Sequence, residues 1–221
     1  MQVKPLALDG VFEIIPARFG DARGFFSETW KRSALAEHGI DLDFIQDNHS
    51  LSVPTGTLRG IHYQAPPMAQ DKLVRCTRGR VFDVAVDLRT GSPTRGQWVG
   101  LILDAATGNQ ILVPKGFGHA FQTLEPDCEV QYKVTAPYAP DCDRSIRWDD
   151  PAIGDPRAWL TRQLGAFDPA PAAIAALPGR AAIAAAYLGY REDRQAMRQE
   201  AADMPMSEEE KGMDPELRRL S

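Results

Sequence analysis

Cysteine is scarce in this sequence of 221 residues. The three cysteines, Cys76, Cys128 and Cys142, are odd in number and lack any Cys-x-x-Cys spacing. A disulfide-stapled scaffold is therefore excluded, and we interpret all three cysteines as structural. The N-terminus also lacks the charged and then apolar segment of a secretory signal, so we expect the protein in the reducing cytoplasm.

Long apolar runs are missing as well. No window approaches the roughly 20 consecutive apolar residues of a membrane span, so we expect no membrane partner. Neither sign of charge dominates, because 25 basic residues stand against 30 acidic ones for a net charge of −5. This balance argues against nucleic-acid binding but leaves room for a local basic pocket that holds a small anion. The 43% of hydrophobic and 25% of charged residues are ordinary globular values.

Short alternating segments separated by glycine turns make up most of the chain. In residues 81–88 the even positions are apolar, whereas Asp83 and Asp87 share the opposite face, which predicts a half-buried strand. Similar segments predict seven more strands, at residues 44–52, 57–63, 72–77, 97–103, 110–113, 119–124 and 129–135. Their number and the glycine turns indicate a mainly β, antiparallel fold of the jelly-roll kind, closed or in two sheets.

Helix is predicted in two places. Ser27 can cap the run from residue 28 to residue 38 and Gly39 can end it, which gives a short helix near the N-terminus. Past residue 150 an alanine-rich stretch with prolines leads into a helical pattern over residues 180–202, and a last capped helix follows. We therefore expect a β domain at residues 1–168 and a helical C-terminal extension at residues 169–221, packed on the domain or trailing from it.

Three of the four histidines fall among the predicted strands, at His49, His62 and His119, which raises the question of a metal site. A metal-binding jelly roll usually has two histidines one residue apart, followed by a carboxylate. Here Tyr63 and Gln64 follow His62 instead. We therefore expect neither a metal nor any other cofactor.

A set of cationic and phenolic residues surrounds His62 in the sequence. Arg59 precedes it by three residues, Lys72 follows it by ten, and Tyr132 lies on a later strand where it shares a face with two valines. A histidine, a lysine and a tyrosine that converge inside a barrel suit proton abstraction next to a carbonyl. They supply a base, a cation for the enolate and a proton donor. The alternative is that the inward histidine and tyrosine are core residues satisfied by hydrogen bonds.

Eight longer segments carry a family resemblance. They are FGDARGFFSETW (19–30), QDNHS (46–50), LRGIHYQ (58–64), KLVRC (72–76), GRVFDVAVDLR (79–89), VPKGFGHAFQTL (113–124), YKVT (132–135) and CDRSIRWDDP (142–151). In this order they resemble the dTDP-4-dehydrorhamnose 3,5-epimerases of deoxysugar biosynthesis. The resemblance implies a metal-free cupin-type jelly roll and a homodimer. It also implies inversion of C3 and C5 in a nucleotide-linked 4-keto-6-deoxyhexose.

The resemblance further implies roles for individual residues. His62 is the base that removes the protons at C5 and C3, Tyr132 returns a proton on the other face, and Lys72 stabilises the enolate oxygen at C4. Both carbons lie next to the C4 ketone, so their protons are acidic only when the enolate charge is neutralised. The family's substrate contacts fall on Arg23, Glu28, Gln46, Asp47, Asn48, Arg59 and His119. The two arginines suit the diphosphate, and Arg23 and Glu28 reach the neighbouring subunit's site.

The resemblance ends after Pro151. Family members usually continue with a Leu-Ser-x-Lys-Asp segment, whose Asp pairs with the catalytic histidine, but this chain reads AWLTRQLGAFDPAPAA over residues 158–173. Asp168 and Asp83 then compete as the partner of His62, and its place in the chain favours Asp168. Three functions stay open: epimerisation at C3, C5 or both; isomerisation or epimerisation of another nucleotide sugar; and nucleotide-sugar binding without catalysis.

Overall fold

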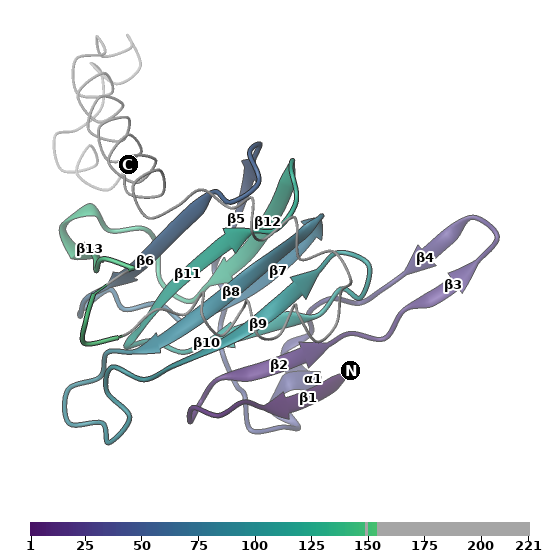
Figure 1. Ribbon diagram of the computed structural model, residues 1–221. Coiled ribbons are helices and arrows are strands. Elements are labelled where there is room, and N and C mark those ends of the chain that lie inside the picture. Colours follow the sequence, from purple (N-terminus) through teal and green to yellow (C-terminus); the bar gives the residue numbers. More distant parts are fainter. Residues whose placement is uncertain (149, 154–221) are drawn as a thin grey trace, which may run out of the picture. The chain divides into compact units, whose positions relative to one another are not determined.

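The computed structural model describes residues 1–148 and 150–153, which are mainly β (Figure 1). The strands are β1 (Gln2–Pro5), β2 (Phe12–Ile15), β3 (Phe19–Asp21), β4 (Gly24–Phe26), β5 (Gln46–Ser52), β6 (Leu58–Gln64), β7 (Lys72–Arg78), β8 (Arg80–Asp87), β9 (Trp98–Asp104), β10 (Gln110–Val113), β11 (Phe117–Thr123), β12 (Cys128–Val134) and β13 (Asp143–Ser145). The helical elements are α1 (Arg32–Ala36) and a 3-10 turn, η1 (Pro140–Cys142). Within the described ranges, no helix has the length and apolar character to cross a membrane. The expected helical extension at residues 169–221 lies outside them.

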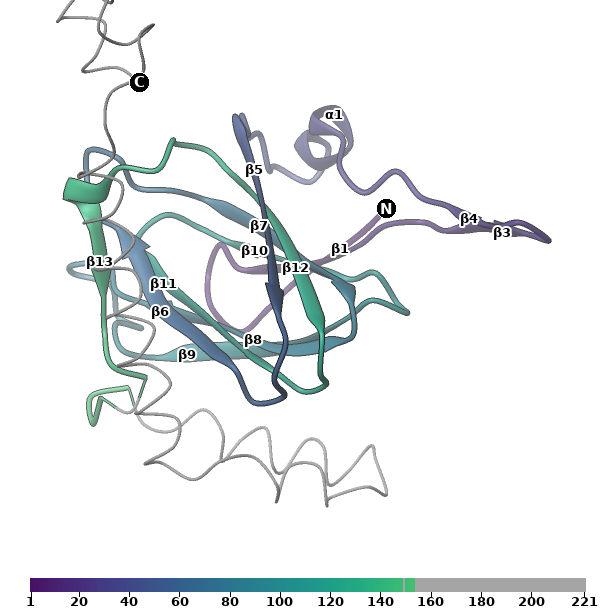
Figure 2. The same cartoon turned by 90° about the horizontal axis from the view of Figure 1, so that it is seen from above.

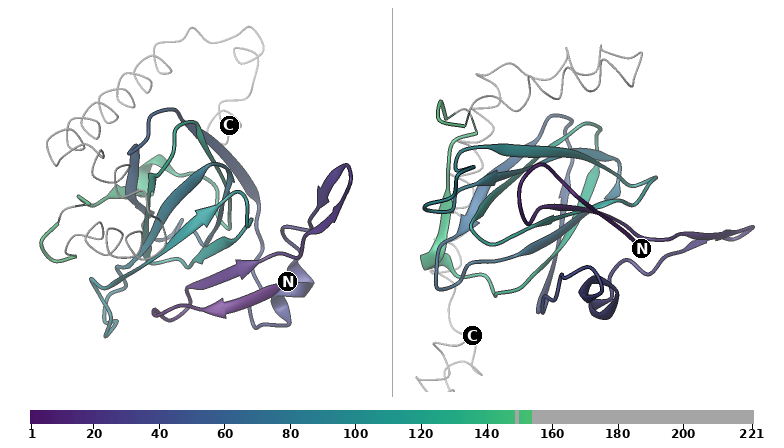
Figure 3. Two further views of the ribbon diagram at one scale, coloured as in Figure 1. Left: turned by 45° about the vertical axis from the view of Figure 1, so that its right-hand side comes forward. Right: turned by 90° about the horizontal axis from the view of Figure 1, so that it is seen from below.

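The strands form two antiparallel sheets that face each other (Figure 2). One sheet has six strands in the order β1-β2-β10-β7-β12-β5, and the other has five in the order β13-β6-β11-β8-β9. Strands β3 and β4 pair in a hairpin that extends away from both sheets (Figures 1 and 3). All eight strands predicted from the alternating pattern are present. The expectation of a mainly β, antiparallel fold is therefore confirmed.

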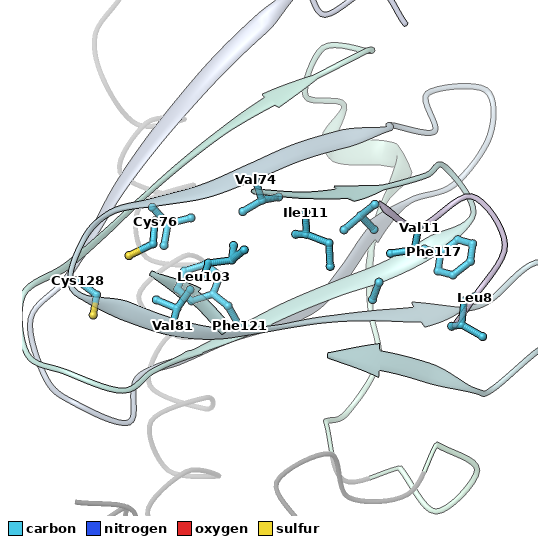
Figure 4. Packing of buried hydrophobic residues seen from close by; sticks show 13 residues of the cluster. Leu8, Val11, Val74, Cys76, Val81, Leu103, Ile111, Phe117, Phe121 and Cys128 are labelled. Atoms are coloured by element: carbon cyan, nitrogen blue, oxygen red, sulfur yellow. The ribbon is translucent and has the colours of Figure 1, made fainter. Parts of the chain in front are cut away.

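The main hydrophobic core lies between the two sheets (Figure 4). Val74 and Val130 contribute to it from the six-stranded sheet, and Val81, Ala85 and Phe121 contribute from the five-stranded sheet. Successive side chains of a strand point to opposite faces. Residues an even number of positions from these core residues on a regular strand therefore also point into the space between the sheets.

Strand β8 is buried on both faces, so the prediction of a half-buried strand is wrong. Phe82 and Val84 belong to a second apolar cluster on the outer face of the five-stranded sheet. Asp83 and Asp87 lie on the inward face and have no exposed surface. Asp87 accepts hydrogen bonds from the backbone and side chain of Arg89 and from two hydroxyl groups of the same loop. Its charge is thus satisfied locally, whereas Asp83 faces the inter-sheet space.

The N-terminal helix is shorter than predicted. It begins after Lys31 without a side-chain cap, because the hydroxyl of Ser27 donates instead to the carbonyl oxygen of Ala17 at 2.9 Å. The helix ends close to the predicted position, since Gly39 follows its last turn with a φ of +78°. The buried side chain of Leu35 packs in a third apolar cluster together with Leu73 and other residues of the six-stranded sheet.

Candidate active site

Strands β6 and β11 bring two of the predicted site residues together. His62 lies directly opposite His119 in the antiparallel pair, so the two side chains share a face. Further along, Arg59 lies opposite Phe121, a residue of the inter-sheet core. Arg59 and His62 are thus three residues apart on β6, whereas their partners Phe121 and His119 are only two residues apart on β11. The difference arises because β6 carries one extra residue in a bulge. The bulge puts Arg59 and His62 on the same inward face, although residues three apart on a regular strand face opposite ways.

Gly60 makes this bulge sterically possible. Its φ of +122° is one that residues with a side chain rarely adopt. A Cβ atom at this position would lie 2.5 Å from the Cβ atom of Ala120 and 2.5 Å from the carbonyl oxygen of His119. The close approach of β6 and β11 beside the two histidines therefore depends on a glycine. In the sequence, a glycine inside a strand pattern is the signal that could have predicted this bulge.

His119 forms a buried pair with Asp83 of the neighbouring strand β8. The Nε2 atom of His119 lies 2.9 Å from each carboxylate oxygen of Asp83, and both residues are buried. A carboxylate in this position fixes the ring orientation and holds the proton of a neutral imidazole on Nε2. Of the two carboxylates considered for His62, Asp83 is thus engaged with His119, and Asp168 lies outside the described residues.

Lys72 enters the same space from the opposite sheet. It begins β7 and shares the inward face with Val74 of the core. Part of its side chain stays accessible, but the surrounding protein lowers its pKa to about 8 by burial, opposed by the negative charges of Asp143 and Asp83. The lysine therefore lies within electrostatic reach of both carboxylates, and its charge is poorly solvated.

Strands β5 and β12 add further predicted residues to the inward face. Tyr132 packs against the inter-sheet core and lies opposite Asn48. The side-chain amide of Gln46 donates a hydrogen bond of 2.8 Å to the amide oxygen of Asn48. Asp47 points to the other face of the sheet, where it accepts two hydrogen bonds of 2.8 Å from Nζ of Lys133. The structure thus groups Gln46 and Asn48 with Tyr132, and separates Asp47 from them.

Arg59 connects the two sheets at this end of the inter-sheet space. Its Nε atom donates to the hydroxyl of Ser52 at 2.9 Å, and a terminal nitrogen donates to the carbonyl oxygen of Leu51 at 3.0 Å. Both acceptors belong to β5, the edge strand of the six-stranded sheet. Strand β5 of the opposite sheet therefore holds the guanidinium group of Arg59 in place.

Two residues that the sequence did not single out also belong to this region. The phenol of Tyr138 donates a hydrogen bond of 3.1 Å to the carboxylate of Asp143, and its backbone N–H donates to the side-chain oxygen of Gln46 at 3.4 Å. Asp143 lies on β13 opposite Gln64 and acts on the charge of Lys72. Both residues lie in or near a short turn and a three-residue strand, where alternation gives no signal.

Arg23 and Glu28 lie elsewhere. Arg23 sits beside the turn of the β3–β4 hairpin with 89% of its side chain exposed, and it pairs with Asp21. Glu28 follows the hairpin and is also exposed. Among the described residues, neither side chain contacts the group around His62, and the β3–β4 hairpin extends away from the two sheets (Figure 3).

The chemistry of the inward group is that of acids, bases and cations. An imidazole can take up a proton, a poorly solvated ammonium group can neutralise an oxyanion, and a phenol can donate a proton. In residues 1–148 and 150–153, no three or more His, Cys, Asp or Glu side chains are placed to hold a metal ion. The arrangement suits the formation and protonation of an enolate.

Known proteins share both the sequence and the fold. Residues 5–168 match the family model of dTDP-4-dehydrorhamnose 3,5-epimerase. The enzyme of that name from Sinorhizobium fredii is 51% identical over 154 residues, which span 70% of this chain and 79% of the relative. The Escherichia coli enzyme is 48% identical over 155 residues, or 69% of this chain and 83% of the relative.

Solved structures agree with this result. A dTDP-4-dehydrorhamnose 3,5-epimerase from Bacillus anthracis, with TDP and PPi bound, superposes with a TM-score of 0.68 at 43% identity, over 70% of this chain and 89% of that one. ChmJ, a 3'-monoepimerase from Streptomyces bikiniensis in complex with dTDP-quinovose, gives 0.65 at 35% identity, over 68% and 76%. The chain is thus an enzyme of the isomerase class. It belongs to the dTDP-4-dehydrorhamnose 3,5-epimerase family, as its sequence motifs predicted.

Proposed function

We propose that this protein epimerises a dTDP-linked 4-keto-6-deoxyhexose at C3, C5 or both, through an enolate. The observation that carries the proposal is the poorly solvated ammonium group of Lys72, which enters the inter-sheet space from the sheet opposite to that of His62 and His119 and lies within electrostatic reach of Asp83. Removing a proton next to a ketone leaves negative charge on the ketone oxygen, and a cation in a low-dielectric site stabilises that charge strongly. Family membership supplies the class of substrate.

We assign the proton transfers to His62 and Tyr132. His62 projects from the five-stranded sheet and Tyr132 from the six-stranded sheet. A sugar ring between them has the base on one face and the phenol on the other, which is the arrangement that inversion requires. His62 then removes the protons, Tyr132 returns a proton from the opposite face, and Lys72 stabilises the enolate oxygen at C4. Asp168 is our proposed carboxylate partner of His62.

The remaining assignments concern substrate binding and the fold. Gln46, Asn48, Arg59 and His119 are proposed substrate contacts, with Arg59 suited to the diphosphate. Asp47 keeps a role only if its backbone takes part, because its side chain lies on the other face with Lys133. The two facing antiparallel sheets support a cupin-type jelly roll, which we take as the domain of residues 1–168, followed by the extension of residues 169–221.

The direct test is solvent exchange. When the protein is incubated with dTDP-4-keto-6-deoxyglucose in heavy water, we expect deuterium at C3, C5 or both, without added metal or nicotinamide. Proton NMR of each carbon then separates a 3,5-epimerase from an enzyme that inverts one centre. If the substrate binds but takes up no deuterium at either carbon, the proposal is contradicted, and the protein binds the nucleotide sugar without catalysis. Activity that a chelator abolishes and zinc restores would contradict the mechanism.

We also propose a homodimer in which each active site uses residues of both chains. The β3–β4 hairpin exposes Phe19, Phe25 and Phe26 by 67%, 62% and 70%. Three large apolar side chains on a projecting arm are costly in water and are typical of a surface that another chain covers. The same arm carries Arg23, which has a charge suited to a diphosphate.

Subunit complementation tests this dimer. An Arg23→Ala variant and a His62→Asn variant are each expected to be inactive as pure dimers. After subunit exchange, a heterodimer contains one site with both native residues, so mixing is expected to restore about a quarter of the wild-type activity, on the basis that random pairing makes half of the dimers mixed. The hairpin variant Asp21→Asn, which alters the exposed partner of Arg23, serves as the control for the arm. A monomeric mass, or no recovery after proven exchange, would contradict the shared site.

A further inference from the structure

Ser52 is a buried serine at the end of β5, and its hydroxyl contacts Arg59. The residue is 2% exposed and lies opposite Cys128, which belongs to the main hydrophobic core. It shares the inward face with Asn48, four residues earlier on the same strand. The hydroxyl oxygen accepts a hydrogen bond of 2.9 Å from Nε of Arg59. Burying a hydroxyl beside apolar groups costs free energy unless it is hydrogen-bonded, so the contact with Arg59 accounts for a serine at this core position.

The hydroxyl of Ser52 and the carbonyl oxygen of Leu51 hold one edge of the Arg59 guanidinium group. The Nε atom donates to Ser52, and a terminal nitrogen donates to Leu51 at 3.0 Å. A guanidinium group is planar and has its five N–H donors in a fixed fork. Two donors held on the β5 side therefore fix the plane of the group and the direction of its other edge. That other edge has the paired N–H geometry that suits two oxygens of a phosphate group.

Both of these acceptors are uncharged. Arg89, by contrast, donates to the carboxylate of Asp87 at 2.8 Å. A carboxylate balances the positive charge of an arginine and competes with an anionic ligand for its donors. A hydroxyl and a carbonyl oxygen orient the guanidinium group of Arg59 without adding a negative charge beside it. The contact with Ser52 thus suits an arginine that binds an anion.

The connection between β5 and β6 keeps Ser52 and Arg59 at this distance. The hydroxyl of buried Thr123 donates to the carbonyl oxygen of Pro54 at 2.9 Å and accepts from the backbone N–H of Thr57 at 2.9 Å. The hydroxyl of Thr57 donates to the same carbonyl oxygen at 2.8 Å. Strand β11 therefore anchors the connection on both sides of its turn, and the position of the Ser52 hydroxyl is fixed independently of a ligand.

We propose that Ser52 is a positioning residue for Arg59, whose guanidinium group it orients toward the diphosphate of the nucleotide sugar. The inference rests on the proposed function only through the assignment of Arg59 to the diphosphate. The diphosphate takes no part in the proton transfers, so its contacts are equally strong before and during the reaction. Losing the Ser52 hydroxyl is therefore expected to weaken substrate binding and to leave kcat unchanged.

The test is a double-mutant cycle of Ser52→Ala and Arg59→Met in the full-length chain, with dTDP binding measured by calorimetry. Ser52→Ala is expected to raise the Kd of dTDP about 5- to 10-fold, since a charge-assisted hydrogen bond loses its acceptor. KM for dTDP-4-keto-6-deoxyglucose is expected to rise by a similar factor, with kcat unchanged. In the Arg59→Met background, Ser52→Ala is expected to leave the Kd unchanged, because the side chain that Ser52 orients is gone. Both substitutions add no bulk, so we expect the fold to be retained, which urea unfolding checks.

Three results for Ser52→Ala would overturn the proposal. They are an unchanged Kd of dTDP, an equal rise of the Kd in both backgrounds, and a fall of kcat with an unchanged KM. If Arg59→Met binds dTDP like the wild type, the assignment of Arg59 to the diphosphate is wrong, and the role of Ser52 falls with it. If the binding cycle gives the expected result but the wild type takes up no deuterium, the proposed epimerisation is contradicted and the role of Ser52 stands.

Discussion

Replacing His62 with asparagine is expected to remove deuterium exchange at both C3 and C5, with a loss of about 10²- to 10⁴-fold for a general base. In the proposed mechanism the same base serves both carbons, because they flank one ketone and their protons leave toward the same sheet. Tyr132→Phe is expected to keep exchange but to impair inversion. Without the phenol on the opposite face, the proton returns from His62 to the side it left.

Exchange and inversion are measured separately, by the loss of the C3 and C5 proton signals and by the coupling constants of the product. The matched control is His49→Asn, because His49 lies on the outer face of β5, is 52% exposed and pairs with Glu129. This variant is expected to exchange at the wild-type rate. Equal rates in the wild type and His62→Asn would remove His62 from the mechanism. Inversion at the wild-type rate in Tyr132→Phe would remove the phenol.

The sequence predicts only in part which site residues contact one another. Alternation correctly grouped Asp83 with Asp87 on one face of β8, but it could not tell whether that face points inward. Both faces of this strand are covered, so its apolar side chains were a poor guide to the core. The partner of Asp83 was also hidden, because His119 is 36 residues away and the contact depends on the register of β8 and β11.

Local irregularities explain the other differences. The spacing of Arg59 and His62 predicts opposite faces on a regular strand, and the bulge at Gly60 puts both inside. Asp47 lies between two predicted contacts in one motif, yet the period of two places it outside with Lys133. Family motifs identify which residues matter, whereas strand register determines which of them meet.

Lys72→Met is expected to lower kcat by about 10²- to 10³-fold, the usual cost of losing one group that stabilises an oxyanion. The substrate ketone is neutral before proton abstraction, so KM is expected to change less than kcat. An effect confined to KM would contradict the assigned role. Exposed Lys115 provides the control, because Lys115→Met removes an equal charge outside the site and is expected to leave kcat unchanged.

The same substitution is expected to stabilise the fold. Burial holds the pKa of Lys72 at about 8, below its ordinary value of 10.5, even with Asp143 and Asp83 nearby. The charged form is therefore disfavoured in the folded state, at a cost of about 2–3 kcal/mol after allowance for the accessible part of the side chain. This cost is fully present below pH 8, where both states bind the proton. It disappears as the pH rises from 8 to 10.5, because only the unfolded state then keeps the proton.

Urea unfolding at several pH values tests this linkage. At pH 7, Lys72→Met is expected to unfold at higher urea concentration than the wild type, and the difference is expected to shrink above pH 8. In the wild type, kcat is expected to fall as the pH rises through about 8, since neutral Lys72 cannot stabilise the enolate. A variant that is inactive and also less stable at pH 7 would mean that the attraction to Asp83 and Asp143 outweighs the cost of burial, and that Lys72 holds the two sheets together.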